Sequence, residues 1–318
     1  MAKFLITGGD GYLAQHVINL LLSKGHAIIA IDDGFNQLQV PDEYEPLLER
    51  FIFSLLNKKQ LDNAFTAADV CIHLASPAHV MPDGLFNSSV LTDKTLHEVA
   101  IVEGLNVFHA AIDSNVPVIF TSTDSVYGPN ISSPLYESAQ MMPINLMGVH
   151  KLSLEHHARV LGLTHGLNSI SMRLFNVYGM WRPNWESDVI SQFCRSALVG
   201  DELVVHGNGE QVRDFIHVSD VARAFYLVSK KFKVGYACYN ICTGQATSLN
   251  TLIDMLSSLL GYRLRVRYDN KRAGDVYCAV GSNRKISKDF NFMPRVDISS
   301  GLRSVLKEAG AITLQKAI

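Results

Sequence analysis

Three closely spaced glycines near the N-terminus, followed by an acidic residue, have the spacing of a dinucleotide-binding turn. Gly8, Gly9 and Gly11 lie between an apolar run and an amphipathic stretch, and Asp32 ends the next apolar run at 27–31. Such glycines let the backbone approach a pyrophosphate, which would lie on the positive N-terminal end of the following helix. An acid about 20 residues further on, at the end of the second strand, hydrogen-bonds the ribose hydroxyls of adenosine. The pattern predicts a nucleotide-binding unit.

The residues after Asp32 indicate which dinucleotide this unit would bind. The charge of Asp32 would repel a 2′-phosphate, and residues 33–37 include no Arg or Lys that could bind one. A glycine turn alone is weak evidence, because such turns also connect strands and helices that bind nothing. Here the strand, the helix and the acid all agree with it, and this context favours binding. We therefore predict NAD, and not NADP, as the cofactor.

Composition and charge argue against several classes of partner. The chain has 318 residues, 47% of them hydrophobic, and 28 basic against 30 acidic residues give a net charge of −2. This balance argues against nucleic acid or an anionic membrane as a partner. We expect no targeting segment before the first strand and no apolar run long enough to cross a bilayer. The five cysteines are odd in number and scattered, which predicts reduced thiols, a cytoplasmic location and no metal site.

Strand-like apolar runs alternate with helical patterns in the first half of the chain. This alternation predicts an α/β fold of the Rossmann type, with a doubly wound parallel sheet and helices on both faces. A polar stretch at 76–95 predicts a long loop over the C-terminal edge of the sheet, where loops contact ligands. The second half predicts helices near 187–199, 218–230 and 248–260. The predicted strands are 3–7, 27–32, 50–53, 69–74, 116–122, 169–175, 203–206 and 264–268.

Several segments resemble the extended short-chain dehydrogenase/reductase family, specifically its NAD-dependent nucleotide-sugar epimerases and dehydratases. They extend over essentially the whole chain: 69–76 (DVCIHLAS), 121–128 (TSTDSVYG), 173–179 (RLFNVYG), 207–209 (GNG), 211–220 (QVRDFIHVSD) and 239–241 (YNI). The resemblance implies that NAD removes hydride from a sugar carbon, usually C-4, of a nucleoside diphosphate sugar. It also implies a cofactor domain at 1–175, to which 212–243 returns, and a smaller C-terminal α/β substrate-binding region at 176–211 and 244–318.

The catalytic helix of such enzymes has the pattern Tyr-x-x-x-Lys, and this chain departs from it. Lys151 occupies the lysine position and Thr123 that of the hydroxyl that meets the sugar, but Met147 stands where the phenol is expected. A four-residue offset places Met147 and Lys151 on one helix face. A thioether has no proton to exchange and cannot act as a general base. General acid–base catalysis by the phenol is typically worth about 10²–10⁴-fold in rate, roughly 3–5 kcal/mol of barrier. Without the phenol, another group must supply this contribution or the enzyme must forgo it.

Three side chains are candidates for the missing base. Asp124 belongs to a segment similar to that of the hexose 4,6-dehydratases, although Ser125 replaces their glutamate; a turn-capping role for Asp124 is the alternative. His150 lies three residues after Met147 and, as a histidine, could take a hydroxyl proton near neutral pH, unless its ring faces solvent. His79, in the long loop, is the third. If none takes over, Thr123 and water would relay the proton.

The resemblance also implies the remaining contacts. Two further departures are Ser54 in place of an acid that meets adenine and the absence of the family's usual Asn near 100–105. For the substrate, Asn176, Arg182, Arg213 and Arg272 match family positions, with surface ion pairs as the alternative for the arginines, and His79, Thr123 and Asp124 are further candidates. Cofactor contacts are predicted for Gly8, Gly11, Tyr12, Leu13, Asp32, Asp33, Ser54, Leu55, Leu74, Ala75, Ser76 and Lys151. Helices near 98–113 and 150–161 would form a homodimer.

Two functions remain open from the sequence. The first is an NAD-dependent enzyme that dehydrogenates, epimerises or dehydrates a nucleotide-activated sugar, with a specialised reaction favoured by the loss of the phenol. The second is a catalytically inactive NAD-binding protein that acts as a sensor or subunit partner. Retention of Lys151, Thr123 and the diphosphate arginines favours the enzyme, because an inactive scaffold has no physical need for a sugar-nucleotide site.

Overall fold

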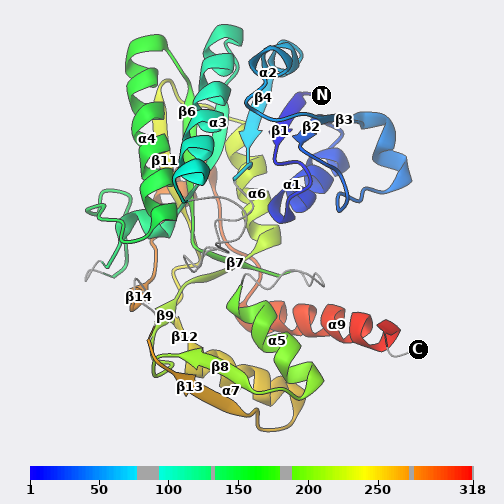
Figure 1. Cartoon of the computed structure of the whole chain (residues 1–318), viewed down its shortest axis with the longest axis vertical. Coiled ribbons are helices and arrows are strands. Elements are labelled where there is room, and N and C mark those ends of the chain that lie inside the picture. Colours follow the sequence, from blue (N-terminus) through cyan, green and yellow to red (C-terminus); the bar gives the residue numbers. More distant parts are fainter. Residues whose placement is uncertain (77–92, 130–132, 180–187, 272–275, 317–318) are drawn as a thin grey trace. The chain divides into compact units, whose positions relative to one another are not determined.

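The computed structural model describes residues 1–76, 93–129, 133–179, 188–271 and 276–316 (Figure 1). Most of the loop predicted at 76–95 lies outside these residues, as do His79, Arg182 and Arg272. No helix among the described residues is both long and apolar enough to cross a membrane.

The chain forms two compact units. The first comprises residues 1–126, 146–173 and 222–239, and the second comprises 127–145, 174–221 and 240–318. The first unit thus recruits a segment from beyond residue 211, in the part of the chain expected to return to the cofactor domain. The second unit also takes up residues 127–145, which the sequence had assigned to the cofactor domain.

A seven-stranded sheet forms the centre of the first unit, in the order β11-β6-β5-β4-β1-β2-β3. The pairings that link β1 to β2 and β4, β2 to β3, and β4 to β5 are parallel. The strand order reverses beside β1, and ligands of such sheets bind at the carboxyl ends of the strands at this point. This architecture confirms the predicted Rossmann-type fold. The strands are β1 (Lys3–Thr7), β2 (Ala27–Asp32), β3 (Leu48–Ile52), β4 (Val70–His73), β5 (Val118–Thr123), β6 (Ser169–Leu174) and β11 (Tyr236–Ile241).

Both faces of the central strands of this sheet are buried because these strands are apolar at successive positions. Leu5 and Phe120 pack on one face with side chains from α2, α3 and α4, whereas Phe4 and Ile6, at alternate positions of β1, are buried on the other. Gly104 lets α3 approach α4, since a Cβ there would lie 2.5 Å from a methyl of Leu154. The helices are α1 (Tyr12–Ser23), α2 (Lys58–Phe65), α3 (Asp93–Ser114), α4 (Leu146–His165) and α6 (Val218–Ser229), with 3₁₀ turns η1 (Asp42–Leu47) and η2 (Asp124–Tyr127).

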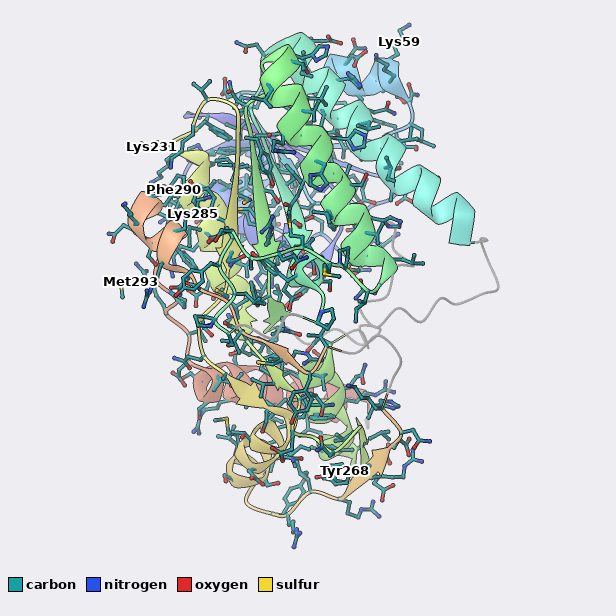
Figure 2. All side chains as sticks on the ribbon, turned by 90° about the vertical axis from the view of Figure 1, so that its left-hand side faces the viewer. Lys59, Lys231, Tyr268, Lys285, Phe290 and Met293 are labelled. Atoms are coloured by element: carbon teal, nitrogen blue, oxygen red, sulfur yellow. The ribbon has the colours of Figure 1, made fainter. Side chains whose placement is uncertain are left out.

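The second unit combines short strand pairs with helices around its own apolar core. The side chains of Asp188 and Ser248 cap the N-termini of α5 and α7, and both helices end at a glycine in the left-handed conformation. Outward-facing side chains include Tyr268 of β13 (Figure 2). Its strands are β7 (Asn176–Tyr178), β8 (Leu203–His206), β9 (Val212–Arg213), β10 (Phe215–His217), β12 (Thr247–Ser248), β13 (Val266–Asp269) and β14 (Cys278–Ala279), and its further helices are α5 (Val189–Val199), α7 (Leu249–Leu260), α8 (Arg284–Phe290) and α9 (Ile298–Lys316).

Candidate active site

The glycine turn after β1 has the backbone conformation that the sequence predicted. Gly8 has a φ of +69°, and a Cβ on it would lie 2.6 Å from the backbone nitrogen of Ala75. The Gly11 N–H donates to the Gly8 carbonyl at 3.1 Å and closes the turn. Only glycine fits at position 8, because any side chain would be strained in φ and would collide with the chain after β4. The turn therefore packs directly against the chain after β4 at the carboxyl edge of the sheet.

Asp32 is held at the end of β2 by two backbone amides. One carboxylate oxygen accepts from the Asp10 N–H at 2.9 Å and the other from the Asp33 N–H at 2.8 Å. Burial, together with the neighbouring Asp33, raises the pKa of Asp32 to about 6. The acid predicted to meet the ribose is thus fixed directly beside the glycine turn.

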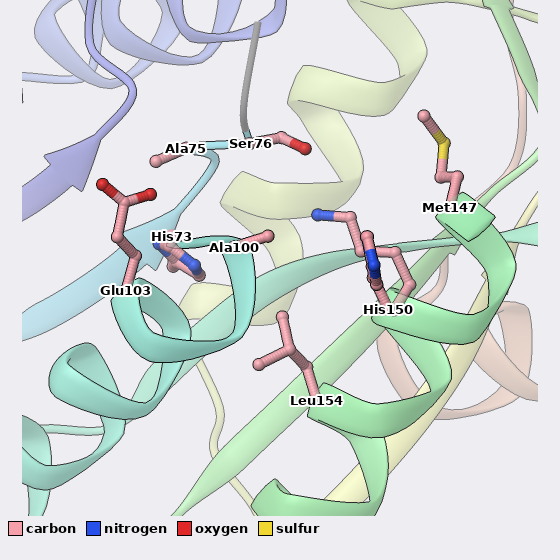
Figure 3. A pocket seen from close by; sticks show the side chains of 9 residues that line it. His73, Ala75, Ser76, Ala100, Glu103, Met147, His150 and Leu154 are labelled. Carbon is pink, nitrogen blue, oxygen red and sulfur yellow. The ribbon is translucent and has the colours of Figure 1, made fainter. Parts of the chain in front are cut away.

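A pocket opens at the carboxyl edge of this sheet, between the end of β4 and the helices α3 and α4 (Figure 3). In the figure, His73 and Glu103 lie on one side of the pocket and Met147 and His150 on the other. Five of the lining residues are site residues predicted from the sequence, namely Ala75, Ser76, Met147, His150 and Lys151. The full lining consists of His73, Ala75, Ser76, Ala100, Glu103, Met147, His150, Lys151 and Leu154.

Lys151 is the central cation of this pocket. Its side chain is buried, and its Nζ donates to the Thr121 Oγ1 at 3.1 Å. Burial lowers the pKa of Lys151 to about 8. A buried ammonium that lines a pocket can donate hydrogen bonds to hydroxyls of a bound molecule, which is the role expected for the lysine of the Tyr-x-x-x-Lys pattern.

Met147 and His150 lie on the same face of α4 as Lys151. All three line the pocket, so the thioether of Met147 lies in the same site as Lys151 and His150. His150 is only 6% exposed, and the alternative of a solvent-facing ring is therefore wrong. Of the described candidates for the missing base, His150 is the one that lines the pocket.

His73 and Glu103 line the pocket without having been predicted. His73 Nδ1 lies 2.7 Å from the Thr7 Oγ1, and burial, followed by the charge of Lys151, lowers the pKa of His73 to about 3, so this ring stays neutral. Burial and the charges of Asp33 and Asp32 raise the pKa of Glu103. The signal in the sequence was helical spacing, since Ala100 and Glu103 are three residues apart and share a face of α3.

Thr123 and Asp124 lie at the carboxyl end of β5, outside the nine residues that line the pocket. The Thr123 hydroxyl donates to an Asp124 carboxylate oxygen at 3.2 Å and accepts from the Ser125 N–H at 3.2 Å. Their side chains are half-buried. This arrangement fits the turn-forming role considered for Asp124, and its part in chemistry stays a prediction.

The other predicted cofactor contacts lie near the same edge of the sheet. Tyr12 and Leu13 begin α1, directly after the glycine turn. Ser54 follows β3, where its Oγ accepts from the Leu56 N–H at 3.2 Å, and the carbonyl of the buried Leu55 accepts from Asn106 at 3.0 Å. Leu74 extends β4 through a 3.1 Å hydrogen bond to the Thr7 carbonyl. Contacts of these residues with a cofactor remain predictions.

Two predicted substrate residues lie in the second unit. The Nδ2 of Asn176, at the start of β7, is buried and has no acceptor among the described residues. A buried amide with an unused donor is costly unless a ligand or water accepts from it. Arg213 lies on β9, and its Nη1 donates to the Val212 carbonyl at 3.0 Å.

A buried ion pair that was not predicted from the sequence anchors α4 to the sheet. The Arg173 Nη2 on β6 lies 2.6 Å from the Glu155 Oε2, and both side chains are 3% exposed. Glu155 also accepts from the Ser171 hydroxyl at 3.1 Å and from the Tyr236 hydroxyl at 3.0 Å. Because Glu155 lies one turn beyond Lys151, this network fixes the helix that positions the pocket residues.

Comparisons with known proteins agree with this geometry. The family model described as "NAD dependent epimerase/dehydratase family" matches residues 4–242. A UDP-glucose 4-epimerase of Azospirillum brasilense is 29% identical, over 96% of this chain and 91% of its own length. Among solved structures, the UDP-glucose 4-epimerase of Thermotoga maritima with UDP-glucose is 28% identical, with a TM-score of 0.85 over 98% of this chain and 99% of its own. The UDP-glucose 4-epimerase of Thermus thermophilus with NAD is 25% identical, with a TM-score of 0.81 over 96% of this chain and 98% of its own.

Proposed function

The chain belongs to the NAD dependent epimerase/dehydratase family, and on that premise we propose that it is an NAD-dependent enzyme that acts at C-4 of a nucleoside diphosphate sugar. The observation that supports this most is the pocket itself, in which Lys151, His150 and Met147 gather at the carboxyl edge of the sheet that bears the glycine turn. The inactive alternative is not favoured, because the similar proteins are named as enzymes over nearly their full length.

The first unit fits NAD. The glycine turn at 8–11 would receive the pyrophosphate, and Asp32 provides an anchored carboxylate with lone pairs for ribose hydroxyls. Lys151, at the pocket, would hold the nicotinamide ribose. When bound, NAD supplies reversible hydride transfer.

The proton that leaves the sugar hydroxyl is the task of this chain's own residues. We assign it to His150, since an imidazole can accept a proton and Met147 cannot. Lys151 would orient the reacting groups by hydrogen bonding, and the hydroxyl of Thr123 would bind the sugar hydroxyl. Met147 would fill the volume of the absent phenol with an apolar group.

UDP-sugars are the substrate class that the relatives support. The Thermotoga maritima enzyme was solved with UDP-glucose, and we extend this class to the present chain. Asn176, with its unused buried donor, and Arg213, with a planar fork suited to phosphate oxygens, would bind the diphosphate or sugar. Arg182, Arg272 and His79 keep the substrate roles predicted for them.

We further propose a cytoplasmic homodimer. Apolar side chains on α3 and α4 are exposed, with Val102 at 44%, Val149 at 47%, Val160 at 50% and Leu163 at 81%. Pairing of these helices with those of a second copy would bury them. The five cysteines, all within the described residues, form no disulfide with one another, which is compatible with a reducing compartment.

Mass spectrometry, preceded by chromatography that separates C-4 epimers of equal mass, tests the function directly with a panel of sugar nucleotides. The purified protein is incubated with NAD and, one at a time, UDP-glucose, UDP-glucuronic acid, UDP-N-acetylglucosamine and dTDP-glucose. We expect one class to lose two hydrogens, to lose water or to change configuration at C-4. No change in any of them, at full NAD occupancy, would contradict the proposal.

Asp32→Ala should weaken NAD binding by about 1–3 kcal/mol, because the ribose hydroxyls lose a buried acceptor. The sign of the pH dependence follows from the raised pKa of about 6. Protonation below that pH removes acceptor capacity, so the NAD affinity of the parent should fall as the pH falls through about 6, and that of the variant should not. Calorimetric titration measures both effects, and tighter binding of NADP than of NAD by the parent would disprove the assignment.

Arg213→Ala should raise the dissociation constant for a UDP-sugar and leave NAD binding unchanged. Charge-assisted hydrogen bonds to phosphate contribute roughly 1.5–3 kcal/mol, about 10–150-fold in affinity. Arg272→Ala should behave in the same way. Arg267→Ala is the matched control, since that side chain is 55% exposed and pairs with surface acids. Unchanged UDP-sugar affinity in both test variants would contradict their assignment.

A further inference from the structure

Asp10, inside the glycine turn, binds a row of backbone amides from the loop after β2. One of its carboxylate oxygens accepts from the Gln37 N–H at 2.8 Å and the Leu38 N–H at 2.6 Å. The other accepts from the Asn36 N–H at 2.9 Å. Three consecutive N–H groups thus converge on one carboxylate, which is the geometry of an anion-binding backbone nest.

The same loop is fastened independently to α1. Gln15 Oε1 accepts from the Gln39 N–H at 2.9 Å, and its Nε2 donates to the Gln39 carbonyl. Asn19 Nδ2 also donates to that carbonyl, at 3.0 Å. Because α1 already holds position 39, the bonds to Asp10 are not the only attachment of this loop.

This nest lies beside Asp32, the acid predicted to bind the adenosine ribose. The loop directly follows Asp32, and the Asp10 N–H itself donates to the Asp32 carboxylate at 2.9 Å. In dinucleotide-binding folds the groups beyond this acid decide whether a 2′-hydroxyl or a 2′-phosphate is accepted. Amide donors here would serve a phosphate well, but in this chain the protein's own carboxylate occupies them.

We propose that Asp10 is a specificity-determining residue that excludes NADP. Its carboxylate fills the nest at 36–38 and adds a fixed negative charge beside Asp32, so a 2′-phosphate finds neither free donors nor a favourable potential. This inference rests on the proposed function insofar as NAD is the cofactor. It adds that the preference for NAD over NADP does not depend only on Asp32 and on the lack of basic residues at 33–37.

Titration of the full-length protein with NAD and with NADP tests the proposal, with the ratio of the two dissociation constants as the readout. In Asp10→Asn and Asp10→Ala we expect the preference for NAD to shrink by about tenfold or more, because the charge is removed and donors are released. Gln15→Ala is the control: it loosens the loop at Gln39 but leaves the nest filled, so its ratio should match the parent's. Thermal unfolding confirms that each variant is folded.

The outcomes separate the two proposals. An unchanged ratio in both Asp10 variants overturns the role of Asp10 even if NAD binds normally. An equal shift of the ratio in Gln15→Ala also overturns it, because loop integrity would then explain the effect. A parent protein that binds neither dinucleotide refutes the proposed function instead.

Discussion

Replacement of His150 by alanine should lower the rate of hydride removal from the sugar by about 10²–10⁴-fold, roughly 3–5 kcal/mol of barrier. Among the described titratable residues that line the pocket, His73 is a poor base because burial keeps its pKa near 3, and the Lys151 ammonium donates a hydrogen bond to Thr121. Glu103 lies on the side of the pocket opposite Met147. His150 remains as the imidazole beside Met147. Single-turnover formation of NADH with a reactive UDP-sugar measures the effect.

Two variants control this experiment. His156→Ala removes an exposed histidine from the same helix and should leave the rate unchanged. Asp124→Asn tests the competing base at the end of β5. A full rate in His150→Ala together with a lost rate in Asp124→Asn would transfer the role to Asp124.

The variant Met147→Tyr tests whether the pocket can still accommodate a tyrosine phenol. The new side chain would lie beside Lys151, where it could restore ordinary proton transfer or crowd the site. A parent that never reduces NAD with any sugar nucleotide, beside a tyrosine variant that does, would show that the natural site is inactive. Activity in the parent would support the proposal that a residue other than Met147 accepts the proton from the sugar hydroxyl.

Glu155→Ala should lower the free energy of unfolding by about 3–5 kcal/mol, because it leaves the Arg173 guanidinium in the core without its carboxylate. Ser171 and Tyr236 lose an acceptor in the same variant. Denaturant unfolding at neutral pH measures the change. The matched control is Glu45→Ala, which breaks the exposed pair with Arg50 and should cost under about 1 kcal/mol.

The pH dependence of this pair has a definite sign. Burial raises the pKa of Glu155, but the hydrogen bonds and the charge of Arg173 outweigh it, so the pKa lies below its ordinary value. The stabilisation is therefore present above the pKa of the unfolded chain and is lost as the pH falls through that of the folded chain. The difference in the free energy of unfolding between the parent and Glu155→Ala should therefore decrease at acidic pH. An increase of this difference at acidic pH would contradict the ion-pair explanation.

The sequence by itself determined the fold class and the position of the glycine turn and of Asp32 at neighbouring strand ends. Local signals suffice for these, because a glycine that must adopt a positive φ, such as Gly8, and an acid at a strand end, such as Asp32, are written in adjacent elements. The apolar runs located eight strands, among them six of the seven in the main sheet, to within about two residues for the same reason, but β11 and the remaining short strands of the second unit were not predicted. Helical spacing also placed Met147 and Lys151 on one face.

Only the tertiary structure decided which side chains enter the pocket and what holds them there. Spacing left His150 open between solvent and cleft, and the packing of α4 against the sheet settled its burial. Glu103 enters the pocket because α3 approaches α4 at Gly104, and Arg173 reaches Glu155 across 18 residues. The three amides bound by Asp10 lie 26–28 residues away in sequence. Such contacts depend on how separate elements pack, which periodicity along the chain does not encode.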